Sequence, residues 1–170
     1  MKAKNSKAKQ SKQRQAQNDP FAVFKRSTAA LFSFLVHDYD FEKISTTVYL
    51  PECEIKYRND TTGVAITYEW GSVVWVDLSR LTRNGEEVIE GEGYSLDLLM
   101  LECLPSLDIN HFYPAQGEVP DDFVKRVLGD YARILKEYGG AILNGDFRIF
   151  PKLKKHGEEV LKQRNKEMFG

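Results

Sequence analysis

The longest run of apolar, β-branched and aromatic residues extends from Gly63 to Ser79 and predicts a β-hairpin. Trp70-Gly71 separates two stretches of alternating character, so we interpret it as a two-residue turn. This turn places Ile66 opposite Trp75 on the face that the pattern assigns to the core. The register depends on the turn, because a slip by one residue would move every side chain to the other face.

In this register a second apolar stripe lies on the face opposite the core. It consists of Val74, Val76 and Leu78. Successive side chains of a strand point to opposite faces of the sheet, so these three cannot share the core with Trp75. We expect either the C-terminal helix of the chain or a partner to cover them.

The segments around this hairpin predict further strands and several helices. Residues 53–58 alternate apolar with charged side chains, and Asn84-Gly85 indicates a second hairpin turn before a short strand at 86–90. Helices are predicted at 20–37, 96–104, 120–138 and 157–169. The predicted fold is α+β, with an N-terminal helix, an antiparallel β-meander of three to five strands, and C-terminal helices packed on the sheet.

The chain of 170 residues divides into a basic tail at 1–19, expected to be disordered, and a single domain at 20–170. Its net charge of -1 hides an uneven distribution. Residues 1–19 carry 6 basic and 1 acidic side chain, residues 20–147 carry 11 and 21, and residues 148–170 carry 7 and 3. An acidic body therefore lies between two basic ends.

The basic tail has two interpretations. It can bind nucleic acid through phosphate contacts, or it can act as a solubilising terminus, since it contains no aromatic side chain for base stacking. The basic residues concerned are Lys2, Lys4, Lys7, Lys9, Lys12 and Arg14.

An acidic edge follows the second predicted hairpin turn. It contains Glu86, Glu87, Glu90 and Glu92. No His or glycine-rich loop accompanies these carboxylates, so a solvated edge that attracts a basic protein partner fits them better than a metal site.

Two segments contain candidate chemical groups. His37, Asp38 and Asp40 bring together an imidazole and two carboxylates, which suit a divalent cation but also fit a polar loop. His111 lies in the long loop at 105–119, where a titrating role competes with simple packing of the loop. No partner for His111 can be assigned from the sequence.

The remaining patterns favour a non-enzymatic protein without a cofactor or a metal. Cys53 and Cys103 lack metal-binding spacing and are typical of small buried side chains in a reducing compartment. No apolar run reaches the roughly 18 residues of a membrane span, and no apolar signal segment follows the N-terminal lysines. We therefore expect a cytoplasmic protein that does not enter a membrane.

Between about residues 31 and 150 the layout resembles that of uncharacterised small bacterial immunity-type proteins. The likeness is carried by Phe32-Ser33-Phe34-Leu35, Tyr39-Asp40-Phe41, Ile55-Lys56-Tyr57-Arg58-Asn59, Val64-Ala65-Ile66 and the segment from Tyr138 to Asp146. The resemblance implies a protein that neutralises a toxin by binding it, often with an acidic face. The lysine-rich tail departs from this layout.

Three functions remain as hypotheses. The first is a protein-binding module that presents an acidic face and the stripe of Val74, Val76 and Leu78 to a partner. The second is a nucleic-acid-associated accessory protein that uses residues 2–14. The third is a metal-dependent hydrolase or nuclease that uses His37, Asp38 and Asp40, or His111.

Overall fold

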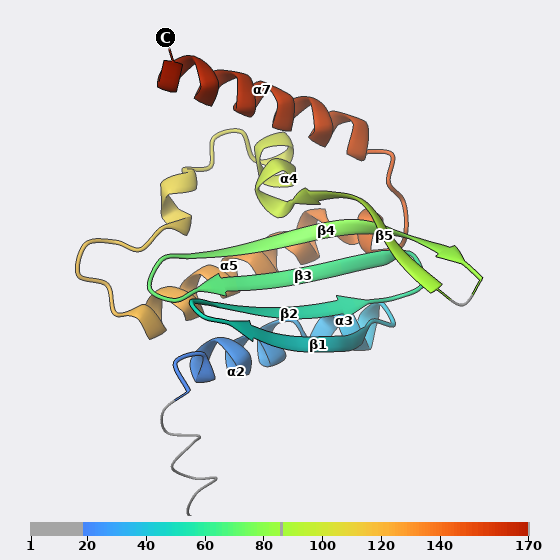
Figure 1. The fold of residues 1–170 in the computed structure, drawn as a ribbon, viewed down its shortest axis with the longest axis horizontal. Coiled ribbons are helices and arrows are strands. Elements are labelled where there is room, and N and C mark those ends of the chain that lie inside the picture. Colours follow the sequence, from blue (N-terminus) through green and yellow to red (C-terminus); the bar gives the residue numbers. More distant parts are fainter. Residues whose placement is uncertain (1–18, 86, 170) are drawn as a thin grey trace, which may run out of the picture.

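Five antiparallel strands form one sheet in which the strand order follows the chain (Figure 1). The structure is a computed structural model that describes residues 19–85 and 87–169. The strands are β1 (Glu42–Tyr49), β2 (Glu52–Arg58), β3 (Thr62–Glu69), β4 (Val73–Asn84) and β5 (Glu87–Ser95). The predicted antiparallel meander and the α+β fold class are confirmed.

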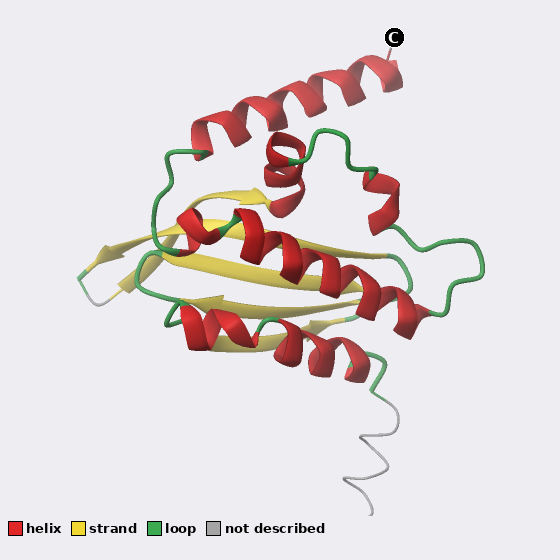
Figure 2. Cartoon of the chain, turned by 180° about the vertical axis from the view of Figure 1, so that it is seen from behind, coloured by secondary structure: helices red, strands yellow, loops and turns green. Residues whose placement is uncertain are grey.

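The helices lie on one face of the sheet and along one of its edges. They are α2 (Ala22–Leu31), α3 (Ser33–Asp38), α4 (Leu96–Cys103), the 3₁₀ helix η1 (Ile109–Phe112), α5 (Pro120–Tyr138), α6 (Gly140–Leu143) and α7 (Phe150–Phe169). Helices α2, α3 and α5 cover the face that Figure 2 turns to the viewer, whereas α4 and α7 lie beside β4 and β5 (Figures 1 and 2).

Local sequence signals explain where several helices begin. Ser95 accepts a hydrogen bond from the backbone N–H of Asp97 (3.1 Å) and caps α4, as its position in the sequence predicts. Pro120 occupies the first turn of α5, where its missing N–H has no cost. At the N-terminus, Asp19 accepts from the N–H of Phe21 (3.0 Å), so this residue belongs to the folded domain.

The predicted helix at 20–37 is divided into two. The chain leaves α2 at Phe32, whose side chain is fully buried, and resumes as α3. The last helix is longer than predicted, because α7 begins at Phe150 and not at Gly157. No helix in the described ranges combines the length and apolar character that a membrane crossing requires.

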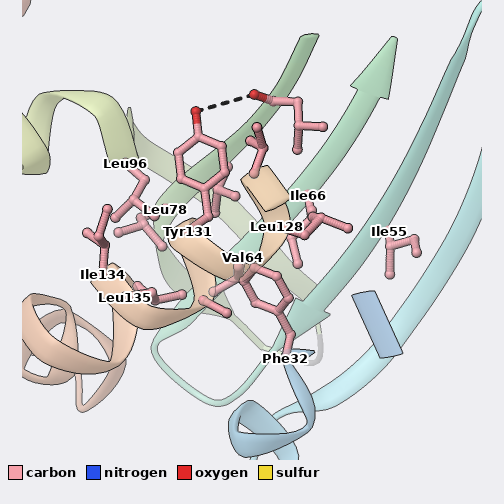
Figure 3. Close-up of a cluster of buried hydrophobic side chains, with 14 of the residues drawn as sticks. Phe32, Ile55, Val64, Ile66, Leu78, Leu96, Leu128, Tyr131, Ile134 and Leu135 are labelled. Carbon is pink, nitrogen blue, oxygen red and sulfur yellow. Dashed lines mark hydrogen bonds between the residues drawn. The ribbon is translucent and has the colours of Figure 1, made fainter. Parts of the chain in front are cut away.

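The core lies between the sheet and α5. Figure 3 shows Tyr131, Leu128, Ile134 and Leu135 of this helix directed at side chains of the strands. The strand side chains of this cluster include Ile55, Val64, Ile66 and Leu78, all essentially inaccessible to solvent. The apolar side chains of α5 are thus part of the core.

The predicted hairpin register is wrong by one residue. Glu69 pairs with Val73, so the loop contains three residues, Trp70, Gly71 and Ser72. Gly71 adopts a positive φ of 75°, which suits a loop of this length, and its N–H donates to the hydroxyl of Tyr68 (2.9 Å). The additional loop residue reverses the two faces of β4 relative to the prediction.

The apolar stripe predicted to face outward consequently belongs to the core. Val74, Val76 and Leu78 are fully buried, and Ile66 lies opposite Val76 instead of Trp75. Helix α5 covers this side of the sheet (Figure 2). A partner therefore cannot reach these three side chains in the folded chain, and their predicted role in partner binding is wrong.

Candidate functional site

One face of the sheet carries no helix within the described part of the chain, and it is the face turned to the viewer in Figure 1. We call it the open face. The corrected register assigns its side chains, because residues that alternate with the buried ones must point there. Its charged and aromatic members are Glu42, Tyr49, Glu52, Glu54, Lys56, Arg58, Glu69, Trp75, Asp77, Arg83 and Glu90.

One end of the open face carries carboxylates with few opposing charges. Glu52 on β2 is directly opposite Glu69 on β3, and Glu54 is the next residue of β2 on the same face. Within residues 19–85 and 87–169, neither Glu52 nor Glu69 forms an ion pair. Like charges directly across two strands repel each other. We call Glu52, Glu54 and Glu69 the acidic end.

A row of three side chains crosses the open face next to this acidic end. Thr67 pairs with Glu54 on one side and with Trp75 on the other. Only 4% of Thr67 is exposed, although no helix covers it, because its larger neighbours surround it. Its hydroxyl has no hydrogen-bond partner in the described part of the chain, yet the oxygen atom retains some contact with solvent.

Asp77 follows Trp75 on the open face and lies in an unfavourable environment for a negative charge. Partial burial raises its pKa, and the nearby carboxylates of Asp97, Glu54 and Glu90 raise it further. The nearby indole of Trp75 opposes this effect and lowers the pKa. The open face is therefore an acidic surface that also carries the aromatic ring of Trp75.

The basic side chains of the open face are already engaged. The Nζ atom of Lys56 lies 3.6 Å from Glu54 and 3.7 Å from Glu90. Arg58 donates to Glu42 (3.1 Å), and Arg83 donates to Asp60. Because these cations are paired, they leave Glu52 and Glu69 uncompensated.

The contact between Lys56 on β2 and Glu90 on β5 shows that the sheet curls, since two strands separate them. A pocket of about 140 Å³ lies inside this curl. Its apolar lining comes from Ile44, Ala65, Leu81 and Val88, with Lys56, Arg58 and Glu90 around them. Gly63 permits the close approach of β4, because a Cβ atom there would lie 2.5 Å from the Ser79 hydroxyl oxygen.

The predicted acidic edge does not form a single surface. Glu90 pairs with Leu81 and joins the open face, whereas Glu87 pairs with Asn84 and points to the other side. Glu92 accepts a hydrogen bond from the hydroxyl of Tyr94, a side chain that packs against Phe150. Glu86 lies outside the described residues.

The basic residues predicted to bind nucleic acid, at positions 2–14, also lie outside the described residues, so their role stays a prediction.

The structure separates the residues of the candidate metal segment. His37 and Asp38 are exposed at the end of α3. Asp40 instead lines a polar pocket of about 430 Å³ with Glu42, Asp60 and other side chains. Among the described residues, no group of three or more His, Cys, Asp or Glu side chains is arranged to hold a metal ion.

His111 has a carboxylate partner that the sequence does not reveal. Its Nε2 atom lies 2.8 Å from Oδ2 of Asp130 on α5. Arg126, one turn earlier on the same helix, donates to the backbone oxygens of His111 and Tyr113 and to the carboxylate of Glu118. The pair therefore belongs to a set of contacts that attaches the loop at 105–119 to α5.

Comparison of the chain with protein-family models, with curated proteins and with solved structures finds no match.

Proposed function

We propose that the chain is a non-enzymatic module that binds a basic protein partner on its open face. The observation that carries this proposal is the cross-strand pair of Glu52 and Glu69, which lies on an uncovered surface without a cation. A basic partner would supply the missing positive charges and remove the repulsion between the two carboxylates.

The surroundings of this pair suit a protein ligand. Trp75 is half-buried on the same face, and Tyr49 is 70% exposed at the adjoining edge. Aromatic side chains of this kind are enriched where proteins bind one another, since they provide large apolar contact areas at a small entropic cost. The acidic end and these two rings together define the proposed binding surface.

The resemblance to immunity-type proteins extends the proposal to a toxin as the partner, neutralised when the open face binds it. The two free thiols, Cys53 and Cys103, suit a reducing compartment, which supports a cytoplasmic location as part of the same proposal.

Charge reversal on the full chain tests the proposed surface. The variant Glu52→Lys/Glu69→Lys is compared with Glu87→Lys/Glu158→Lys, a control with the same change in net charge at exposed sites away from the open face. Both variants and the wild type are used to capture proteins from a native lysate. We expect one basic protein to be retained by the wild type and the control, and to bind the open-face variant at least about tenfold more weakly.

The identified protein then serves as a purified ligand. Titration by calorimetry gives its affinity for all three chains, and co-expression shows whether the wild type relieves any growth inhibition that this protein causes. Equal affinity for the wild type and the open-face variant would refute the proposed surface.

A further inference from the structure

We propose that Glu54, Thr67 and Trp75 form a subsite for one arginine side chain of the partner. The inference rests on the proposed function, because it names the group that this partner inserts into the open face. The three residues come from β2, β3 and β4 and form one straight row across the sheet. Side chains directly opposite each other in such a row have Cβ atoms about 4.5–5.5 Å apart, so a single group can touch all three.

Thr67 provides the observation that points to a ligand. Its side chain is polar and almost completely buried, and its hydroxyl has no partner among the described residues. Buried hydroxyl groups are normally hydrogen-bonded, because an unmade hydrogen bond is unfavourable. The oxygen atom remains reachable from solvent. A donor that approaches from the open side would therefore complete its hydrogen bonding.

The flanking groups favour a cationic donor with a flat shape. Glu54 provides a carboxylate on one side of Thr67, and Trp75 provides an indole on the other. A guanidinium group can donate several hydrogen bonds in one plane while its face stacks on an aromatic ring. An ammonium group is a compact charge and is more strongly hydrated. The chemistry of the row thus selects arginine over lysine.

One feature prepares the row before a ligand arrives. Lys56 holds the carboxylate of Glu54 at 3.6 Å. Groups that are already oriented lose less conformational entropy on binding. Asp77 is the next residue of β4 on the open face and lies opposite Ala65.

The test uses oligo-arginine and oligo-lysine peptides of equal length as probes. The full chain carries Trp70→Phe, which leaves Trp75 as its only tryptophan, since the sequence has two. Titration followed by Trp75 fluorescence should show that oligo-arginine binds about fivefold more tightly than oligo-lysine. The variant Thr67→Val should lose most of this preference while keeping its melting temperature. Its matched control, Thr46→Val on the edge strand, should retain the preference.

Two results would overturn the arginine subsite alone. The first is equal affinity for both peptides together with loss of their binding in Glu52→Lys/Glu69→Lys, which would leave the proposed binding surface intact. An unchanged preference in Thr67→Val would likewise overturn the subsite. If neither peptide binds, and neither binds after the basic residues at positions 2–14 are replaced with glutamine, the subsite and the proposed surface fail together.

The basic residues at positions 2–14 are the remaining candidate occupant. They are tested by replacing all six with glutamine in the full chain. If oligo-arginine binds only after this replacement, the N-terminal segment of the chain is the occupant, and the assignment of the subsite to a partner is overturned.

Discussion

Glu52 and Glu69 lie directly opposite each other on adjacent strands, and no cation in the described part of the chain pairs with either. Like charges directly opposite each other reduce the stability of a sheet, in which a cross-strand pair typically contributes roughly 0.2–1 kcal/mol. Surface residues that destabilise a fold are often retained because a function requires them. The same pair is therefore expected to oppose stability and to promote binding.

The first prediction separates these two effects. In Glu69→Gln the repulsion disappears, so the free energy of unfolding should rise by roughly 0.2–1 kcal/mol. Binding to oligo-arginine should weaken at the same time, because one negative charge is lost. Urea denaturation and fluorescence titration measure the two quantities. The control Glu87→Gln removes a charge from β5 on the other side of the sheet and should change neither. A loss of stability in Glu69→Gln would contradict the repulsion argument.

The second prediction tests the corrected register of β4. Leu78 is fully buried against the helices, whereas Val73 is only half-buried on the open face. Leu78→Ala should therefore lower the free energy of unfolding by roughly 2–5 kcal/mol, and Val73→Ala by less than about 1 kcal/mol. Chemical denaturation monitored by circular dichroism gives both values. The sequence-based register predicts the reverse order, so a larger effect at Val73 would restore it.

The alternation of residues predicts the strands, but it does not determine how β3 and β4 pair. Ser95 could be identified as a helix cap because capping depends on its immediate neighbours, and the structure confirms it. The loop from Trp70 to Ser72 is different, since two-residue and three-residue turns both suit its composition. The choice between them depends on the burial of Val76 under a helix more than 40 residues away in the chain.

The candidate site depends on this same pairing, so its composition was not visible in the sequence. Glu52 and Glu69 become neighbours only when β2 pairs with β3, and Thr67 reaches Trp75 only in the observed register. The acidic run after Asn84 was a stronger signal in the sequence, but alternation distributes its members over two faces. The partner of His111 could not be predicted either, because Asp130 approaches it from a separate helix.

The third prediction concerns Asn59, whose amide connects three segments. It donates to the backbone oxygens of Tyr39 (3.2 Å) and Leu143 (3.0 Å), and its oxygen accepts from the N–H groups of Thr61 and Thr62. The same oxygen also accepts from the hydroxyl of Thr61 (3.3 Å). Asn59→Ala removes all five bonds and should lower the free energy of unfolding by roughly 2–4 kcal/mol.

The variant Asn59→Asp distinguishes the donors from the acceptors. It keeps the three acceptor bonds but directs a carboxylate at the oxygens of Tyr39 and Leu143, so it should be at least as destabilising as alanine. Urea denaturation measures both variants, with Asn144→Ala as a control for an exposed asparagine in the same pocket. A nearly neutral Asn59→Asp would show that the donor bonds contribute little.

The fourth prediction follows from the partly buried carboxyl group of Asp97. Burial raises its pKa, although the hydroxyl of Tyr131, which donates to this carboxyl group (2.8 Å), and the side chain of Ser95 lower it. The folded state therefore holds the proton more tightly than the unfolded state. The stability that this protonated group contributes is present below the ordinary pKa of 3.8 and is lost as the pH rises through the higher pKa of the folded state.

Asp97→Asn removes this titration while keeping an oxygen that can accept from Tyr131. The variant should gain stability relative to the wild type as the pH rises from about 3.8 towards neutrality. At lower pH the free energies of unfolding of the variant and the wild type should converge. Denaturation at a series of pH values provides the comparison. Asp121→Asn, at an exposed position in the first turn of α5, should show no such gain. Parallel pH profiles of the wild type and Asp97→Asn would contradict the assignment.

The fifth prediction concerns Arg126, which attaches the loop at 105–119 to α5. Its hydrogen bonds to Glu118 lower the pKa of that carboxyl group to about 2. The pKa of Glu118 is thus lower in the folded state than in the unfolded state. The stability that its ionised carboxyl group contributes is therefore present above the ordinary pKa of 4.5 and is lost as the pH falls towards about 2. Arg126→Met keeps the aliphatic stem but should return the pKa of Glu118 towards 4.5 and abolish this acid-dependent loss of stability.

Carbon NMR of the Glu118 carboxyl group measures the change in its pKa in Arg126→Met, and faster amide exchange at Tyr113 would show release of the loop. Arg133→Met, on the same helix, provides the matched control, since Arg133 pairs with Asp130 and Glu137 and not with Glu118. A Glu118 pKa that stays near 2 in Arg126→Met would show that another group holds its charge.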